Sequence, residues 1–237
     1  MAARQPALII TCEHGGNRIP PPYRDMFRGQ RRVLDSHRGY DIGALALARH
    51  LAKYLNAPLH FTTVSRLLVD LNRSVHHYAV FSSVTRQFDP ASRMKLLNDY
   101  YFPYRAAVEH QIARSVGRNR AVIHISVHSF TPKLGDHQRQ ADIGLLYDPA
   151  RNGEKRLCHR LKDTFGGTSP HLRVRRNYPY RGTADGFTTD LRHRFPGNRY
   201  AGIELEINQR LPLGTAQVWR QFQLLVTKTF DTALRTR

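Results

Sequence analysis

The sequence predicts an α/β protein whose largely parallel sheet is covered by helices on both faces. Short apolar runs alternate along the chain with segments of helical periodicity, and several of the runs end in polar residues. Strands that alternate with helices typically form such a sheet. No repeat, low-complexity tract or linker interrupts the 237 residues, so we expect one domain over 1–237.

Five apolar runs predict the strands. Residues 7–12 are apolar and β-branched and end at a Gly-Gly turn. The clearest strand is 121–127, which ends in His128 and Ser129. The others are 58–64, 143–147 and 200–207, and residues 66–71 either belong to the second strand or follow it.

Apolar residues at helical spacing predict helices at 41–55, 91–116, 153–165 and 214–235. Pro103 should kink or split the second helix because proline lacks a backbone N–H. Gly166 and Gly167 should stop the third. Long loops remain at 17–32, 73–90 and 167–198, and such loops in a compact domain are usually functional or mobile.

The large positive net charge is compatible with two classes of function. Lys and Arg number 37 against 18 Asp and Glu, a net charge of +19, which favours nucleic acids or acidic ligands as partners. The arginine- and tyrosine-rich stretch 173–181 has the residue types needed for phosphate contacts and base stacking. The basic residues are nevertheless spread over the whole chain, without a helix-turn-helix, zinc-finger or RNA-recognition signature. An enzyme for anionic substrates is therefore the better interpretation.

Membrane and extracellular classes are not expected. No stretch approaches about 18 consecutive apolar residues, and the run at 8–10 is too short for a signal-peptide core. Cys12 and Cys158 fit a reducing compartment and cannot form a disulfide framework or a cysteine-based zinc site. We expect a cytoplasmic protein without a membrane partner.

Polar residues gather where predicted strands end. Ligands bind outside the carboxyl ends of strands in open α/β sheets. These ends carry Glu13, His14, Asn17, Arg66, Asp70, Asn72, Arg73, His128, Ser129, Glu204 and Glu206. Imidazoles, carboxylates and arginines together are typical of a hydrolytic metal site for an anionic substrate. Each residue alone has a plainer interpretation, because most histidines at strand ends are structural.

Five sequence blocks sharpen this hypothesis. They begin at Thr11, His37, Ser65, His128 and Glu206 and read TCEHGGNRIP, HRGYDIGA, SRLLVDLNR, HSFTP and EINQRL. In order and spacing, from residue 8 to about 211, they resemble the N-formylglutamate amidohydrolase family, which is related to zinc carboxypeptidases and aspartoacylases. The resemblance implies a three-layer α/β/α sandwich with a mixed, mostly parallel sheet of the zinc-exopeptidase kind. It also implies one zinc ion and cleavage of an N-formyl or N-acyl amino acid such as N-formylglutamate.

The resemblance also implies a metal-ligand set. His14 fits the first position of the His-x-x-Glu motif of the relatives, and His128 fits the later histidine. Asn17 stands where the motif has Glu, and an amide oxygen is a poorer zinc ligand than a carboxylate. Asp41 either supplies the missing carboxylate or caps the helix that follows it. Glu13 is a further candidate.

The substrate would be held by its carboxylate. Asn72 and Arg73 match the pair that binds it in the relatives, with Arg66 as the nearby arginine and Asp70 orienting one of them. A guanidinium suits bidentate recognition of a carboxylate. The segment 177–186 also resembles a family block, and it either supplies Tyr180 or Arg181 to the substrate or is an ordered surface turn.

The general base would be a glutamate on the last strand. Glu206 matches the family pattern best, and Glu204 is the alternative. This base would take a proton from zinc-bound water and return it to the leaving amine, with Ser129 as a substrate contact rather than a nucleophile. The Asn17 departure also allows a degenerate site that binds an anionic ligand or nucleic acid without hydrolysis.

Overall fold

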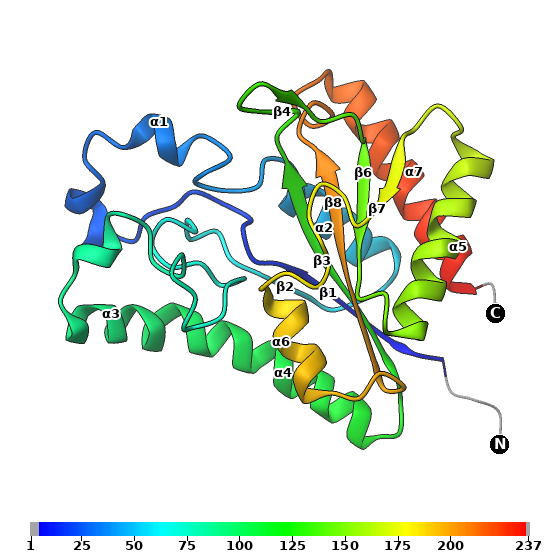
Figure 1. Cartoon of the computed structure of the whole chain (residues 1–237), viewed down its shortest axis with the longest axis horizontal. Coiled ribbons are helices and arrows are strands. Elements are labelled where there is room, and N and C mark those ends of the chain that lie inside the picture. Colours follow the sequence, from blue (N-terminus) through cyan, green and yellow to red (C-terminus); the bar gives the residue numbers. More distant parts are fainter. Residues whose placement is uncertain (1–4, 236–237) are drawn as a thin grey trace.

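The computed structural model describes residues 5–235 and contains one main sheet within them, in the order β2-β1-β3-β8-β6-β7. Strands β1 (Ala7–Cys12), β2 (Leu59–Phe61), β3 (Val122–Phe130) and β8 (Tyr200–Asn208) are mutually parallel. Strand β6 (Ile143–Leu146) runs antiparallel to β8, and β7 (Val174–Arg176) runs parallel to β6. The predicted mixed, mostly parallel sheet is confirmed (Figure 1).

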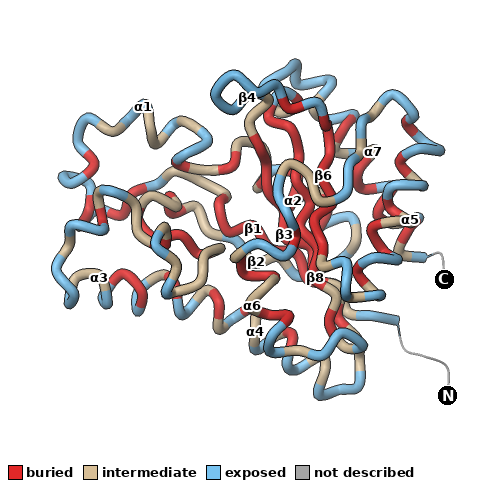
Figure 2. Tube along the Cα trace, in the orientation of Figure 1, coloured by how far each residue is buried: buried red, intermediate tan, exposed pale blue. Residues whose placement is uncertain are grey.

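Helices cover both faces of this sheet (Figure 1). Helices α2 (Ala44–Tyr54), α5 (Asn152–Thr168) and α7 (Ala216–Arg235) contribute to the larger core on one face. Helices α4 (Phe102–Gly117) and α6 (Phe187–Arg194) form a smaller core on the other. Figure 2 shows that the central strands are buried between these layers.

The alternation of side chains along the central strands separates apolar from polar residues. Odd-numbered residues of β3 and β8 belong to the larger core: Ile125, Val127, Ile203, Leu205 and Ile207. Even-numbered residues face the opposite side, and the register pairs Ser126 with Glu204 and His128 with Glu206. The pattern that builds the core therefore also gathers buried polar groups on a single face.

Two segments expected to be loops, 17–32 and 73–90, fold together with the start of the predicted 91–116 helix into a smaller lobe beside the sheet (Figure 1). It contains η1 (Pro21–Phe27), α1 (Arg31–Leu34), η2 (Thr85–Gln87) and α3 (Pro90–Leu96). Its core includes Tyr23, Phe27, Leu68 and Leu96. The third expected loop, 167–198, contains β7 and α6. These stretches are compact because scattered apolar residues from distant parts of the chain pack together.

Of two predictions about helices, one is confirmed and one is wrong. The 91–116 helix is split, as expected, into α3, a π-helical turn η3 (Leu97–Tyr101) and α4, with Pro103 in the first turn of α4. The stop at Gly166 and Gly167 is wrong, because α5 continues to Thr168. A glycine costs a helix only about 1 kcal/mol, and Phe165 of α5 is fully buried in the core.

Two strand predictions also need correction. Strand β3 continues through His128 and Ser129 to Phe130, so these two residues lie within it rather than after it. Residues 66–71 form turns and do not extend β2. The small hairpin of β4 (Lys133–Leu134) and β5 (His137–Gln138) follows β3.

A buried ion pair joins α5, α6 and β8, and its removal should destabilise the fold. Arg192 Nε donates to both Glu154 oxygens at 3.0 and 3.1 Å, and its Nη2 donates to the Gly202 carbonyl at 2.8 Å. Glu154→Gln should lower the free energy of unfolding by about 3–5 kcal/mol, because it leaves the Arg192 charge buried without its partner. Urea unfolding measures this loss. Breaking the exposed Arg194–Glu109 pair with Glu109→Gln should cost less than about 1 kcal/mol, and equal losses would contradict the prediction.

Buried His124 should make stability depend on pH. Burial lowers its pKa to about 4, and its ring nitrogens contact Thr11 Oγ1 at 2.8 Å and Tyr200 Oη at 2.7 Å. The unfolded chain takes up this proton near pH 6.5, so stability should fall by up to about 3 kcal/mol as pH drops from 6.5 toward 4. His124→Gln should flatten this dependence in urea titrations at several pH values. An unchanged pH slope would show that His124 is not responsible.

Candidate active site

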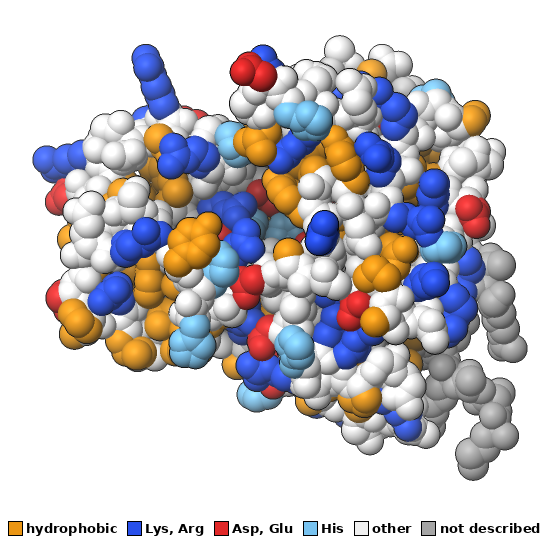
Figure 3. Space-filling view, in the orientation of Figure 1, with side chains coloured by type: hydrophobic (Ala, Val, Ile, Leu, Met, Phe, Trp, Pro, Cys, Tyr) orange, Lys and Arg blue, Asp and Glu red, His pale blue; other side chains and the backbone are white. Residues whose placement is uncertain are grey.

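A pocket of about 190 Å³ opens at the carboxyl ends of β1, β3 and β8, beside the smaller lobe. The sequence-predicted residues that line it are His14, Asp41, Arg66, Asn72, Arg73, His128, Ser129, Tyr180, Glu204 and Glu206. Figure 3 views this face and shows basic and acidic side chains around a central hollow. Three of the predicted site residues, Asn17, Glu13 and Asp70, do not line the pocket.

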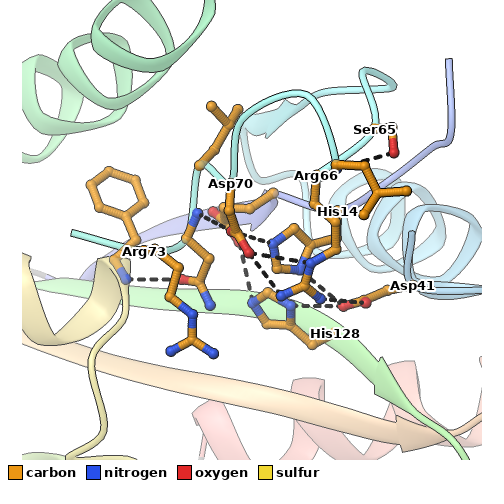
Figure 4. Close-up of polar contacts among 12 residues, drawn as sticks. His14, Asp41, Ser65, Arg66, Asp70, Arg73 and His128 are labelled. Carbon is orange, nitrogen blue, oxygen red and sulfur yellow. Dashed lines mark hydrogen bonds and ion pairs between the residues drawn. The ribbon is translucent and has the colours of Figure 1, made fainter. Parts of the chain in front are cut away.

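Asp41 lies between the two predicted histidines (Figure 4). Its Oδ2 is 3.3 Å from His14 Nδ1 and 2.9 Å from His128 Nδ1. All three residues are buried, and their potential ligand atoms lie within 4.8 Å of one another. Among the described residues, they form the group of His, Cys, Asp or Glu side chains suited to a metal ion.

The backbone directs Asp41 into this group. Its N–H donates to the His14 carbonyl at 2.9 Å, which ties the segment before α2 to the end of β1. Helix α2 begins at Ala44 with Gly43 at its N-cap, so the interpretation of Asp41 as the helix cap is wrong. Gly43 has a φ of 84°, a conformation that glycine adopts readily.

The Nε2 atom of each imidazole, on the side of the ring away from Asp41, contacts a carboxylate or a hydroxyl group. His14 Nε2 is 2.7 Å from Asp70 Oδ1. Burial disfavours ionisation of Asp70, but Arg66 and His14 hold its pKa well below the ordinary value. A carboxylate only accepts hydrogen bonds, so His14 Nε2 must carry a hydrogen.

The same reasoning applies to His128. Its Nε2 is 2.8 Å from Ser126 Oγ and 3.3 Å from Glu13 Oε2, and the Ser126 hydroxyl donates to that Glu13 oxygen at 2.6 Å. Because the Ser126 hydrogen is already used, His128 Nε2 must donate. Burial opposes the charged ring, yet hydrogen bonds to Asp41 and Glu13 raise the pKa of His128 well above its ordinary value.

These hydrogen bonds turn both Nδ1 lone pairs toward Asp41 Oδ2. Lone pairs that converge in this way repel one another unless a cation, either a proton or a metal ion, lies among them. Metal-ligating histidines commonly donate their other N–H to a carboxylate or another polar acceptor, as these two rings do. Two imidazoles and a carboxylate also suit zinc, so this donor set fits a metal.

The other two candidates for the third ligand lie elsewhere. Asn17 is part-exposed, and its amide donates to Asp35 Oδ1 at 2.8 Å. Glu13 lies behind His128, where it accepts hydrogen bonds from Ser126 and from Tyr104 Oη at 3.1 Å. The geometry thus favours Asp41. Ser126 was not predicted from the sequence, although it shares a strand face with His128 two residues away.

The two glutamates of β8 differ in their surroundings. Glu204 Oε1 accepts a hydrogen bond from Thr188 Oγ1 of α6 at 2.6 Å. Glu206 Oε2 is buried and has no hydrogen-bond partner within residues 5–235. Burial raises the pKa of Glu206 to about 8, with His128 opposing this shift. Glu206 therefore has a buried carboxyl oxygen that is free to exchange a proton in the pocket.

The three predicted substrate-binding residues near β2 have different roles in the structure. Arg66 donates to Asp70 Oδ2 at 2.8 Å and to Asp41 Oδ1 at 3.4 Å, so its charge is already paired. Arg73 donates through Nη1 to the Asp185 carbonyl at 2.8 Å and lines the pocket. Asn72 Oδ1 accepts from the backbone N–H of Phe187 at 2.8 Å.

The loop of residues 177–186 brings Tyr180 to the pocket by lying flat across β6. A Cβ atom on Gly144 would be 2.0 Å from the Tyr178 carbonyl oxygen, and one on Gly182 would be 2.1 Å from the Tyr147 nitrogen. Tyr180 stacks against the Arg139 guanidinium, whose centre is 5.1 Å from the ring centre. The loop is thus closely packed on the sheet.

Comparison with known proteins identifies the family. The family model of N-formylglutamate amidohydrolase matches residues 6–213. The chain belongs to the N-formylglutamate amidohydrolase family. Membership in this family indicates an amidohydrolase that acts on amide bonds, and the resemblance predicted from the sequence blocks is confirmed.

Solved structures of this amidohydrolase fold cover almost the whole chain. The gene product Atu2144 from Agrobacterium tumefaciens superposes with a TM-score of 0.82 at 28% identity, over 97% of this chain and 91% of that one. An N-formylglutamate amidohydrolase from Ralstonia eutropha JMP134 superposes with a TM-score of 0.67 at 20% identity, over 99% and 97% of the two chains, which shows a shared fold. No curated protein matches the sequence. None of the helices within residues 5–235 has the length and apolar character to span a bilayer.

Metal analysis of variants should identify the ligands. If the group holds a metal ion, His14→Ala, His128→Ala and Asp41→Ala should each lose most of it, because each removes one of three converging donors. Ser126→Ala should weaken metal binding by about 10–100-fold through the orientation of His128. Mass spectrometry of metal content, with protein purified without chelator, measures both effects.

Asn17→Ala is the matched control, since Asn17 belongs to the same sequence block but bonds to Asp35. It should retain the metal. Loss of the metal from this variant together with full retention by Asp41→Ala would make Asn17 the third ligand.

Proposed function

We propose that this protein is a zinc-dependent hydrolase that cleaves the amide bond of an N-formyl or N-acyl amino acid such as N-formylglutamate. The observation that carries the proposal is the convergence of His14, His128 and Asp41 on one point of the pocket that Glu206 also lines. Family membership supports amide hydrolysis. We propose further that residues 1–237 form one domain with a site of the zinc-exopeptidase kind.

His14, Asp41 and His128 would hold the metal. Zinc bound there supplies a water of lowered pKa and a Lewis acid for the amide carbonyl. Asp70, Ser126 and Glu13 fix the two rings through their Nε2 atoms. Outer hydrogen bonds of this kind orient the ligands and make them more basic.

Glu206 is the proposed general base. Its unpartnered Oε2 accepts a proton from the attacking water and returns it to the leaving nitrogen, so the products are a carboxylic acid and a free amino acid. A raised pKa suits a group that must both take up and release a proton. Glu204 is the weaker candidate, since Thr188 already donates to it.

Asn72 and Arg73 form the proposed clamp for the substrate carboxylate. Arg73 Nη1 is used by Asp185, which leaves the other guanidinium N–H groups for a ligand in the pocket. Arg66 is more suited to holding Asp41 and Asp70 than to binding the substrate. Ser129 and Tyr180 complete the walls.

A small carboxylated substrate fits better than a nucleic acid. The pocket is lined by four carboxyl groups, those of Asp41, Asp185, Glu204 and Glu206. Because these groups offset the lining arginines Arg66, Arg73 and Arg181, the pocket lacks the excess of positive charge that a chain of phosphates requires, whereas one carboxylate beside Arg73 is well matched. The same density of potential catalytic groups favours a hydrolase over a site that only binds.

Glu206→Gln tests the base. It should lower kcat by at least about 100-fold, because glutamine cannot accept the proton from water, while the metal content stays unchanged. Formate release from N-formyl-L-glutamate and other N-formyl amino acids measures the rate. Glu204→Gln is the matched control and should have the smaller effect.

Two outcomes would contradict these assignments. A larger loss in Glu204→Gln than in Glu206→Gln would move the base to Glu204. If the metal-loaded wild type hydrolyses no N-formyl or N-acyl amino acid, the proposed activity is wrong.

A further inference from the structure

We propose that Arg105, a buried arginine of α4, is a positioning residue that holds the Asn72–Arg73 clamp against α6. Neither the sequence blocks nor the lining of the pocket includes it. The inference rests on the proposed function, because the clamp is part of that function. It adds a residue outside the pocket that determines affinity for the substrate carboxylate.

Arg105 fixes the backbone on both sides of Asn72. Its guanidinium donates through Nη1 to the Leu71 carbonyl at 3.0 Å and to the Arg73 carbonyl at 3.3 Å. Tyr101 Oη also donates to the Arg73 carbonyl, at 2.8 Å. This segment is a turn without strand hydrogen bonds, so these donors, together with Asp70, which accepts from the Asn72 and Arg73 N–H groups, fix the backbone from which the two side chains extend.

The same guanidinium holds the beginning of α6. Nη2 donates to Asp190 Oδ2 at 2.6 Å, and the guanidinium carbon is 4.2 Å from the centre of the Phe187 ring. The segment that includes Phe187 contacts the clamp directly, because the Phe187 N–H donates to Asn72 and the Asp185 carbonyl accepts from Arg73. Arg105 therefore holds the clamp and its supporting segment in one geometry.

A charged side chain is energetically unfavourable in this buried space. Arg105 is only 7% exposed, and burying a guanidinium costs free energy that an apolar residue would not. What arginine adds is a rigid fork of N–H groups that reaches two carbonyls and a carboxylate at once. Those carbonyls flank the clamp, so the cost is explained by positioning rather than by packing.

A surface cavity lies behind the clamp and gives access to this site. It has a volume of about 350 Å³ and is lined by Ser74, His76, Arg105, Asp190 and Arg194, among others. A small guanidinium compound can therefore reach the space that a shortened side chain would leave. Arg194 shares this cavity and the Asp190 carboxylate but pairs otherwise with Glu109, and the Leu71 and Arg73 carbonyls accept from Arg105 instead, so Arg194 provides a control for the loss of a charge beside Asp190.

The test compares substrates with and without the carboxylate. Arg105→Ala should raise KM for the best N-formyl amino acid by about 10–100-fold, the effect of losing a charge-assisted hydrogen bond. KM for the corresponding carboxamide, kcat and the zinc content should change less than about twofold. Arg105→Lys should remain impaired, because an ammonium cannot replace the fork. Arg194→Ala should behave as wild type, and millimolar methylguanidine should partly restore Arg105→Ala.

An equal rise in KM for both substrates, or no rise, would overturn the inference and leave Arg105 a structural residue. If Arg105→Ala does not fold, Tyr101→Phe decides: it should raise KM severalfold for the carboxylate alone, and an unchanged KM would overturn the inference.

Calorimetric binding of N-formyl-L-glutamate separates this inference from the proposed activity. If the wild type binds this compound without hydrolysing it, the activity is wrong, while weaker binding by Arg105→Ala still supports positioning. If the wild type neither binds nor hydrolyses it or any other N-formyl amino acid, both proposals fail.

Discussion

The Asp41 carboxylate, enclosed by two imidazoles, is the constraint around which the site is organised. Burial disfavours an ionised carboxyl group, but His14 and His128 hold the pKa of Asp41 far below its ordinary value. Each imidazole needs its own partner on the outer nitrogen, and Asp70 and Ser126 provide them. Arg66 then compensates both Asp41 and Asp70. The network thus extends from one buried charge to the next until it reaches solvent.

The sheet allows this cluster of buried charges because it keeps polar and apolar side chains of the central strands on opposite faces. In β3 and β8, one set of alternate residues packs against α2, α5 and α7, and the other set includes His128 and Glu206. The opposite face is covered by α4, α6 and turns, and hydroxyl groups of both helices, those of Tyr104 and Thr188, bond to Glu13 and Glu204. An apolar core and a dense cluster of charges can therefore lie on opposite faces of the same two strands.

The sequence predicted the sheet and most pocket residues, because both depend on short patterns along the chain. It could not place Asn17. A Cβ on Gly15 or Gly16 would lie within 2.7 Å of the Thr62 or Thr63 carbonyl oxygen, so the chain leaves β1 pressed against the segment after β2 and carries Asn17 toward Asp35. Asp41 returns to the site through a backbone hydrogen bond to His14 that no spacing rule encodes. Helix α6 and Arg105 were missed because their partners are distant in sequence.

Gly144 links the two halves of the pocket wall. A side chain at this position would contact both the Tyr178 carbonyl and Glu206 Cβ. The 177–186 loop and the proposed base therefore both pack against the backbone of Gly144, which has no side chain. Changes in loop length or path would therefore disturb the reacting group as well. Variation in ligand preference among related chains, and any attempt to redesign it, should proceed through the side chains that this loop displays, such as Tyr180 and Arg181, while its backbone path stays fixed.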